Sequence, residues 1–409
     1  MNLYLIKLGK AWQVIKRDGV CRGLQRVFGA LFSMFRTVGR GDILFISGGI
    51  GDSALYRTVH VAEELRLNGF RCSVTIQDNP FLSSYVDKFS VFVFHRTLYT
   101  EKVKKMIDAI KAQDKVIIFD TDDLVYDPKY LSLMDYYQKM NSLEKKLYQN
   151  GLGGEILRDQ YVKVATTTTS FLAEKLRAEG KEVFIVPNKL SVKDVRDAEK
   201  VCKIPDHLPA VHMHTHALQA GVRNDKGIIR LGYFSGTISH NKDFATITDA
   251  LMRIMEKYPH VELLLVGPLD VESILVQKFR ERIVQLPYAL RAQHFANVAK
   301  CDINLAPLEK DNPFCEAKSE LKFFEAGIVF VPTVAVANRT FAEAVQDGVD
   351  GFVAHGTDEW VEKLSQLIEN KKMRKNMGER AHRTAVERHT TQNAKNLQYY
   401  EYLRERIGK

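Results

Sequence analysis

The sequence predicts an α/β protein in which strands and helices alternate to build two doubly wound domains. Short apolar runs of strand length recur along the chain, and most are followed by a polar or glycine-containing turn and a helical pattern. Strands separated by helices favour parallel pairing, which brings the turns to one edge of each sheet. The 409 residues, 45% of them hydrophobic, suffice for two separate cores.

The first predicted domain opens with a strand at residues 42–46, a glycine-containing turn at 47–53 and a helix at 55–68. Glycines in such a turn let the backbone approach a ligand closely, although the spacing here is not the dinucleotide-binding fingerprint. Further strands are expected at residues 72–76, 91–94, 116–119, 162–166 and 183–187.

Charged residues follow two of these strands. His95 and Arg96 close one strand, and three aspartates close the next. Because ligands of parallel sheets gather at the carboxyl ends of the strands, both positions are candidates for a site. Arg96 suits a phosphate or carboxylate. The aspartates suit acceptor hydroxyl groups or helix caps, with a divalent cation as the alternative; they are Asp120, Asp122 and Asp123.

The second predicted domain begins at residue 227 with a strand at 228–234 and a loop at 235–243. A helix at 244–257 and a buried strand at 261–266 follow, and the next strand and helix lie within residues 280–300. Later helices are expected at residues 358–370 and from about residue 393.

The polar stretch at residues 311–327 lies between the apolar runs 303–307 and 328–337, which predicts the loop and crossover helix of a βαβ unit. At about 100° per residue, Lys318, Lys322 and Glu325 share one stripe of that helix. Two cations near a helix amino terminus suit the diphosphate of a nucleotide, and Glu325 suits ribose hydroxyl groups. The alternative is an ordinary solvated pair of Lys322 and Glu325.

The net charge of +9 is concentrated at the amino terminus, where residues 1–40 hold eight basic residues against Asp18 alone. Trp12, Phe28 and other apolar residues are interleaved with them, which predicts an arm of two amphipathic helices. Such an arm can lie on an anionic membrane surface, and the alternative is a helical hairpin packed on the body of the protein. No nucleic acid partner is expected, because no recognition motif accompanies the basic residues.

Cysteine usage indicates a cytoplasmic protein, and the basic arm places it on the inner face of the cell membrane as an expectation. The five cysteines are widely spaced and lack a CxxC pair, which argues for a reducing compartment and against zinc. No apolar run reaches the roughly 18 residues that span a bilayer, and no cleavable signal is evident. His212, His214 and His216 fit a polar linker, with a metal site as the alternative.

Several residues of the second domain resemble the carboxyl half of the family 4 retaining glycosyltransferases of the bacterial surface-polysaccharide type. Glu325 followed by Ala326, Val331-Pro332, and an acidic-glycine turn from Asp347 to Gly351 match that family. Lys242 aligns with a donor-binding lysine in the loop after the first strand, whereas Thr237 stands where the family has an arginine. Glu316 lies one position from the family's first glutamate, which falls on Ala317, and Phe330 replaces a glycine.

The resemblance implies the GT-B fold, with two Rossmann-like domains facing across a cleft. It implies donor-binding positions at Gly236, Thr237, His240, Ser319, Lys322 and Glu325. The residues expected to act in catalysis are Lys242, Lys318, Glu316 and Asp122, with Lys318 replacing the missing arginine. The expected acceptor and cleft residues are Gly49, Gly51, Asp52, Ser53, Arg57, Arg96, Asp120 and Asp123.

The implied reaction is transfer of a sugar from a nucleotide-sugar to a hydroxyl group of a glycan or lipid-linked saccharide. The family acts without metal or cofactor and retains the anomeric configuration by same-face attack, with the leaving phosphate as the base. The enzyme would be hexosyltransferase-like and would serve cell-surface polysaccharide or lipopolysaccharide synthesis. A catalytically weakened partner subunit of a glycan-assembly complex and a nucleotide-sugar epimerase are the alternatives.

The expected domain order has five parts. They are the arm at 1–40, the acceptor domain at 41–205, a linker at 206–226, the nucleotide-sugar domain at 227–390, and a helix at 391–409 that returns to the first domain.

Overall fold

The computed structural model describes residues 9, 24, 29, 34–138, 140–202, 227–236, 241–271 and 273–408. The chain forms two compact units, one of Met1–Asn188 with Lys395–Lys409 and one of Lys189–Ala394. Most of the predicted arm, the whole linker at 206–226, Thr237 and His240 lie outside the described residues. The domain boundaries expected from the sequence therefore stay predictions.

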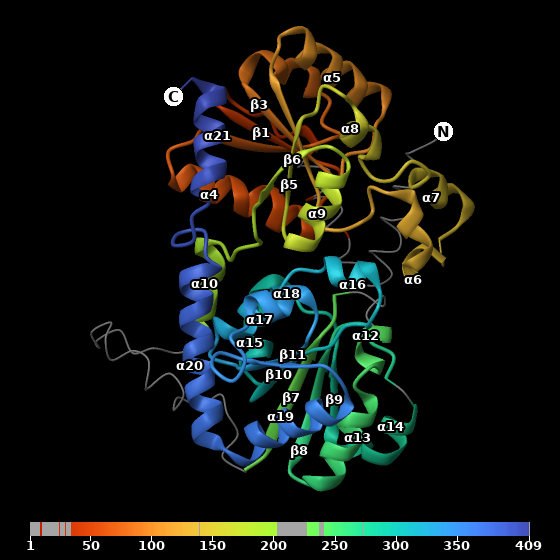
Figure 1. Cartoon of the computed structure of the whole chain (residues 1–409), viewed down its shortest axis with the longest axis vertical. Coiled ribbons are helices and arrows are strands. Elements are labelled where there is room, and N and C mark those ends of the chain that lie inside the picture. The colour runs from red at the N-terminus through yellow and green to blue at the C-terminus, as the bar shows by residue number, and fades with distance from the viewer. Residues whose placement is uncertain are drawn as a thin grey trace. The chain divides into compact units, whose positions relative to one another are not determined.

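The first unit contains a sheet of parallel strands in the order β2-β1-β3-β4-β5-β6 (Figure 1). Both faces are covered, so the strands are apolar on both sides, as parallel sheets require. The strands are β1 (Ile43–Ser47), β2 (Cys72–Ile76), β3 (Val91–His95), β4 (Val116–Asp120), β5 (Val164–Thr167) and β6 (Glu182–Ile185).

Two helices that pack together on this sheet, α4 and α21, are far apart in the sequence. Tyr400 and Leu403 of the last helix are buried in the same core as Phe45 of β1, and the Tyr400 hydroxyl donates to Glu64 of α4. In Figure 1 these two helices, α4 and α21, run beside the sheet. The helices of the unit are α3 (Asp52–Ala54), η1 (Leu55–His60), α4 (Val61–Leu67), η2 (Leu82–Lys88), α5 (Glu101–Ala112), η3 (Pro128–Leu133), α6 (Asp135–Gln138), α7 (Ser142–Leu147), α8 (Gly154–Arg158), α9 (Ser170–Ala178) and α21 (Leu397–Ile407).

The second unit contains a sheet of parallel strands in the order β12-β11-β10-β7-β8-β9. Its strands are β7 (Ile229–Phe234), β8 (Val261–Val266), β9 (Ile283–Leu286), β10 (Ile303–Ala306), β11 (Thr333–Val336) and β12 (Phe352–Ala354). The helices are α10 (Val192–Cys202), α12 (Asn241–Ala245), α13 (Thr248–Lys257), α14 (Ser273–Phe279), η6 (Arg280–Arg282), α15 (Arg291–Val298), α16 (Pro313–Ala317), α17 (Leu321–Gly327), α18 (Arg339–Ala344), α19 (Thr357–Glu369) and α20 (Lys371–Arg388).

These topologies confirm the prediction of two doubly wound α/β units and locate where ligands of such sheets bind. In each sheet the chain first adds strands on one side of the first strand and then adds the remaining strands on its other side. The strand order therefore reverses between β1 and β3 in the first sheet and between β7 and β10 in the second. Ligands of open parallel sheets bind outside the carboxyl ends of the strands at such a reversal.

The prediction of a loop and one crossover helix within residues 311–327, with Lys318 on that helix, is wrong, because two short helices occupy the stretch and Lys318 lies between them. Asn312 caps the start of α16 by accepting from the Phe314 amide, and α16 ends at Ala317, before Lys318, whose backbone is extended (φ −66°, ψ 137°). The next helix, α17, begins only at Leu321. Lys318 is therefore not on the stripe shared by Lys322 and Glu325, and its side chain reaches the site from a loop.

Two further expectations differ in detail. The helix predicted at 244–257 is divided into α12 and α13, and the strand within the apolar run 328–337 begins only at Thr333. Strand β12 and helix α20 have no counterpart among the predicted elements. None of the helices among the described residues has the length and apolar character that crossing a bilayer needs.

Close packing of α20 on the turn after α17 fixes the unusual backbone of Phe330. This residue has φ +62°, its ring stacks on His382 with centroids 3.9 Å apart, and His382 Nδ1 donates to the Ile328 carbonyl at 2.9 Å. A Cβ atom on Gly378 would lie 2.3 Å from the Phe330 carbonyl oxygen. A residue larger than glycine at 378 would therefore separate the helix from the turn.

We predict that Gly378→Ala lowers the free energy of unfolding by about 1–3 kcal/mol, because overpacking outweighs the better helix propensity of alanine. Denaturant unfolding followed by circular dichroism measures the change. Asn376→Ala, an exposed position of the same helix, serves as the control and should change stability by less than about 0.5 kcal/mol. Equal stability of Gly378→Ala and the parent protein would contradict the packing described here.

Candidate functional site

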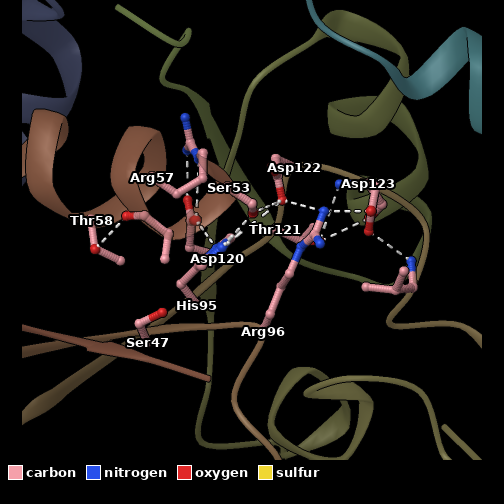
Figure 2. A network of polar contacts seen from close by, with 12 residues as sticks. Ser47, Ser53, Arg57, Thr58, His95, Arg96, Asp120, Thr121, Asp122 and Asp123 are labelled. Atoms are coloured by element: carbon pink, nitrogen blue, oxygen red, sulfur yellow. Dashed lines mark hydrogen bonds and ion pairs between the residues drawn. The ribbon is translucent and has the colours of Figure 1, made fainter. Parts of the chain in front are cut away.

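A network of buried charges lies at the strand reversal of the first unit (Figure 2). Asp120, at the end of β4, is its centre. One carboxylate oxygen accepts from Arg57 Nη2 at 2.6 Å and from the Thr166 hydroxyl at 2.6 Å, and the other lies 2.8 Å from His95 Nδ1. Burial alone would raise the pKa of Asp120, but Arg57 and His95 outweigh it and hold the pKa well below its usual range. Asp120 is therefore ionised.

The network continues from His95 toward the surface. Ser53 Oγ lies 2.9 Å from His95 Nε2 and donates to Asp122 Oδ1 at 3.0 Å. Arg96 pairs with the same Asp122 oxygen at 2.6 Å and also with Asp123. Side-chain exposure rises from 2% at His95 to 13% at Asp122 and 24% at Arg96. The chain of contacts thus joins a buried ion pair to partly exposed polar groups.

The pKa values of the two outer carboxyl groups shift in opposite directions. Burial would raise the pKa of Asp122, but the neighbouring Arg96, His95 and Arg57 outweigh it and lower that pKa. Burial and the neighbouring Asp122 charge raise the pKa of Asp123, although Arg96 opposes them. Arg96 itself has φ +46°, a backbone conformation that is rare outside glycine and is maintained here by the surrounding contacts.

The structure brings together five of the eight residues predicted for acceptor binding, and the other three lie in the exposed turn before and at the start of α3. Ser53, Arg96, Asp120 and Asp123 belong to the network together with Asp122, which was predicted for catalysis. Arg57 also belongs to it but is 1% exposed, so it supports Asp120 rather than facing a ligand. Gly49, Gly51 and Asp52 are exposed in the turn at the start of α3. Thr166 was missed, because only the pairing of β4 with β5 places it beside Asp120.

The second unit gathers cations at the carboxyl end of β7, next to its strand reversal. Lys322 of α17 is partly buried, donates to the carbonyl oxygen of Phe234, and lies 4.7 Å from the centroid of the Tyr233 ring. Desolvation lowers the pKa of Lys322 to about 8, with Lys318 adding to the effect and with Glu325 and Asp243 opposing it. These interactions place Lys318, Lys322 and Glu325 in one electrostatic neighbourhood.

Lys318 is anchored by a carboxylate that the sequence did not identify as a site residue. Its Nζ lies 2.6 Å from Asp243 Oδ2, and Asp243 is 1% exposed. Asp243 Oδ1 also accepts from the Glu309 amide at 3.1 Å and from Cys315 Sγ at 3.3 Å. Lys242 precedes Asp243 on α12 and is exposed. Helix α12 thus supplies one anchoring carboxylate and one solvent-facing cation.

Asp243, Glu309 and Cys315 bring one potential metal-ligand atom each within 4.8 Å of one another. The Lys318 ammonium already pairs with Asp243, and the Cys315 thiol has its pKa raised to about 12, chiefly by burial. A thiol must lose its proton to bind a metal. These three residues are therefore a poor fit for a metal ion in this arrangement.

Glu325, predicted to bind ribose, is held by two residues that sequence reasoning missed. One carboxylate oxygen accepts from Arg291, and the other lies 3.1 Å from His294 Nε2. Arg291 Nε also donates to Asp194 Oδ1 at 2.9 Å. Arg291 and His294 are one turn apart on α15, so only their i,i+3 spacing could have suggested a shared target.

The remaining predicted donor residues lie around this cluster. Gly236 is exposed just beyond β7, and Ser319 is partly buried between α16 and α17. Glu316 Oε2 accepts from the Arg339 amide at 3.4 Å. Thr237 and His240 lie outside the described residues.

Comparison with known proteins gives the fold a context. Residues 230–370, all in the second unit, match the family model described as glycosyl transferases group 1. No curated protein matches the chain. Among solved structures, HepE from Anabaena in complex with UDP is similar at a TM-score of 0.56 and 16% identity, covering 89% of this chain and 100% of that chain.

Two further structures share the architecture. Sucrose-phosphate synthase from Thermosynechococcus elongatus has a TM-score of 0.56 and 12% identity, with 90% of this chain and 99% of that chain covered. A glycosyltransferase from Rickettsia africae has a TM-score of 0.57 at 12% identity, with the same coverage of 90% and 99%. The likeness shows the GT-B fold of two Rossmann-like units, and the family match supports a glycosyltransferase of this type.

We predict that the partial burial of Lys322 makes stability depend on pH. Its pKa is about 8 in the folded protein against 10.5 in a free side chain, so between these values the unfolded chain binds the extra proton. Stability from this group therefore rises with pH across that window and is constant below it. As the pH increases through this window, the free energy of unfolding of the parent protein should rise by at most about 3 kcal/mol more than that of Lys322→Met.

Denaturant titrations at a series of pH values measure this difference. Lys278→Met, an exposed lysine of α14, is the control and should give no such rise. If the free energies of unfolding of the parent protein and Lys322→Met change in parallel with pH through this window, the ammonium group of Lys322 is not desolvated as described.

Proposed function

We propose that this chain is a glycosyltransferase that moves a sugar from a nucleotide-sugar donor to a hydroxyl group. The observation that carries the proposal is the pair of lysines, Lys318 and Lys322, at the carboxyl end of β7 within the residues that match the family model. As the nucleoside diphosphate departs, its charge grows, and cations fixed beside it stabilise the transition state more than the ground state.

The state of these lysines suits an anionic ligand. Lys322 is partly desolvated, and a diphosphate beside it would restore its preference for the charged form. Lys318 has a counter-ion, Asp243, that holds its ammonium group in place before a donor binds. We assign the diphosphate to Lys242, Lys318 and Lys322, ribose to Glu325, and the sugar to Glu316 or the Ser319 amide.

The first unit would bind the acceptor. Ser53, Asp122 and Asp123 offer hydroxyl and carboxylate groups, and Arg96 offers donors, at the strand reversal where a ligand of this sheet is expected. Neutral sugars are bound by such mixed sets of donors and acceptors, because each sugar hydroxyl both donates and accepts. A hydroxyl of a glycan or lipid-linked saccharide fits this set.

Further details of the proposal rest on the sequence. The resemblance to family 4 enzymes supports retention of configuration, independence from metal and cofactor, and a place in cell-surface polysaccharide synthesis. The basic and apolar residues of the segment 1–40 support peripheral attachment to an anionic membrane. HepE was solved with UDP-glucose, so a uridine nucleotide-sugar is the first donor to test.

The test is incubation of the purified chain with UDP-, GDP- and dTDP-sugars, with and without a membrane extract. Transfer of the sugar or hydrolysis of the donor supports the proposal. Interconversion of the sugars would indicate an epimerase, and a chain that binds none of the donors would indicate a subunit without catalysis. Proton NMR of the product reports its anomeric configuration, which should match that of the donor. Turnover should survive EDTA, and its complete loss would refute metal independence.

We predict that Lys318→Ala lowers kcat/KM for the donor by about ten- to a hundred-fold, through a higher KM and a lower kcat, because a charge-assisted contact contributes about 1.5–3 kcal/mol. Lys278→Ala is the control. Since the change also leaves Asp243 without its lysine, the double variant Lys318→Ala/Asp243→Asn separates loss of the cation from an exposed carboxylate. Kinetics of Lys318→Ala equal to those of the control would refute the role of this lysine.

A further inference from the structure

We propose that Arg291 and His294 are positioning residues of the donor site, which hold the carboxylate of Glu325 in the orientation that accepts two neighbouring hydroxyl groups of the donor's ribose. The inference rests on the proposed function, in which Glu325 binds ribose, and it assigns α15 a role in that contact. The geometry behind it is a series of contacts from Asp194 through Arg291 to Glu325, all within the second unit.

Both oxygens of the Glu325 carboxylate are directed by α15. Arg291 Nη1 donates to Oε1, and His294 Nε2 lies 3.1 Å from Oε2. Because one partner acts on each oxygen, the plane of the carboxylate is fixed as well as its position. A carboxylate can accept about four hydrogen bonds, so these two contacts alone do not exhaust it. Two adjacent hydroxyl groups, as on ribose, match the two oxygens of a carboxylate whose plane is fixed.

Arg291 is itself oriented by a third element, α10. Its Nε donates to Asp194 Oδ1 at 2.9 Å, and the side chain of Asp194 is 5% exposed. The other oxygen of Asp194 accepts from the Ser191 amide at 3.0 Å and from the Ser191 hydroxyl at 2.9 Å. The donors of a guanidinium group lie in one rigid plane, so a group that binds Asp194 through Nε presents Nη1 in a set direction. Asp194 therefore orients Arg291, and Arg291 orients Glu325.

His294 links the orientation of Glu325 to the lysine of the same site. Its ring packs edge-on against the ring of Phe234 with centroids 5.6 Å apart, and the Phe234 carbonyl accepts from Lys322. His294 donates to Glu325 when Nε2 carries a hydrogen, which is the form that a carboxylate partner favours. The last residue of β7 thus contacts both the histidine that holds the carboxylate and the ammonium group assigned to the diphosphate.

The contacts direct Lys322 and Glu325 to different partners, although their i,i+3 spacing on α17 suits a pair. Side-chain exposure is 12% for Glu325, 20% for His294 and 24% for Arg291, so a ligand can reach the carboxylate. A nucleoside diphosphate carries its ribose next to its phosphates, and α17 presents a carboxylate and an ammonium group about one turn apart. The arrangement of this helix therefore matches the arrangement of the ligand.

Binding of UDP and of 2′,3′-dideoxy-UDP to the full chain, measured by isothermal titration calorimetry, isolates the ribose contact. For the parent protein we expect UDP to bind about ten- to a hundredfold more tightly, because the analogue offers the carboxylate no hydroxyl groups. Arg291→Ala should reduce this preference to below about threefold by weakening UDP binding, with binding of the analogue nearly unchanged. Arg280→Ala, at an exposed arginine of η6, is the control and should keep the full preference.

His294→Phe is a second variant, because phenylalanine can keep the ring packing against Phe234 but cannot donate to Glu325. We expect it to lower the preference for UDP by about threefold or more. In a Glu325→Gln background, Arg291→Ala should change the preference by less than about twofold, since the carboxylate through which it acts is gone. Retained binding of the dideoxy analogue shows that each variant site is folded.

Donor kinetics supply a readout that a purely structural role would not produce. The ribose contact is the same in the ground state and the transition state, so Arg291→Ala should raise the donor KM about ten- to a hundredfold and change kcat less than about threefold. Lys318→Ala, in contrast, is expected to lower kcat as well. A fall in kcat of about a hundredfold at unchanged donor KM would contradict the role assigned to Arg291.

Failure of the proposed function would be visible separately. If the parent protein binds none of UDP, GDP and dTDP, the donor site fails and the inference fails with it. If the parent protein prefers UDP over its dideoxy analogue and this preference survives both Arg291→Ala and His294→Phe, the inference is overturned while the proposed function stands. If the donor panel selects guanosine, GDP and 2′,3′-dideoxy-GDP replace the uridine pair.

Discussion

The ammonium group of Lys322, held against the carboxyl end of β7 by the Phe234 carbonyl and the Tyr233 ring, is the interaction on which the account of the second unit depends. A cation that loses part of its hydration is costly unless something negative compensates it. Glu325 and Asp243 provide part of that compensation at the site, but they do not restore the ordinary pKa. The position is therefore suited to a ligand that brings negative charge, and a diphosphate is such a ligand.

The same rule organises the first unit, where the carboxyl ends of β3 and β4 bring His95 and Asp120 side by side in register. Ionised groups placed there are stable only when paired, and Arg57 supplies the pairing for Asp120. Toward the surface Arg96 does the same for two more carboxyl groups. Each unit thus keeps reactive polar groups at its strand reversal by balancing charge locally, while the apolar strands beneath supply the stability.

The fold could be predicted from the sequence because strand length and helical periodicity are local properties. The strand expected at 72–76 is β2 itself, and those expected at 91–94 and 116–119 are β3 and β4 extended by one residue. The loop and single helix expected within 311–327 were wrong for a reason that periodicity cannot detect. Helix α16 ends at Ala317, the backbone of Lys318 is extended, and the pairing of Lys318 with Asp243 joins positions 75 residues apart.

The candidate site was predictable only where residues follow strands directly. Asp120, Asp122 and Arg96 come at strand ends, so the rule for parallel sheets located them. Arg291 and His294 could not be found, because their contact with Glu325 depends on how α15 packs beside α17. The pairing of Asp243 with Lys318 was hidden in the same way, since no local pattern distinguishes an anchoring carboxylate from a solvated one.

The central claim, that Lys322 and its neighbours bind a diphosphate, has one most direct test. Isothermal titration calorimetry of UDP binding at about pH 8.5, in buffers of different ionisation enthalpy, measures the protons taken up on binding. With the pKa of Lys322 at about 8 before binding, the account predicts proton uptake by the parent protein and its loss in Lys322→Met. Binding of UDP without proton uptake, or uptake that persists in the variant, would contradict it.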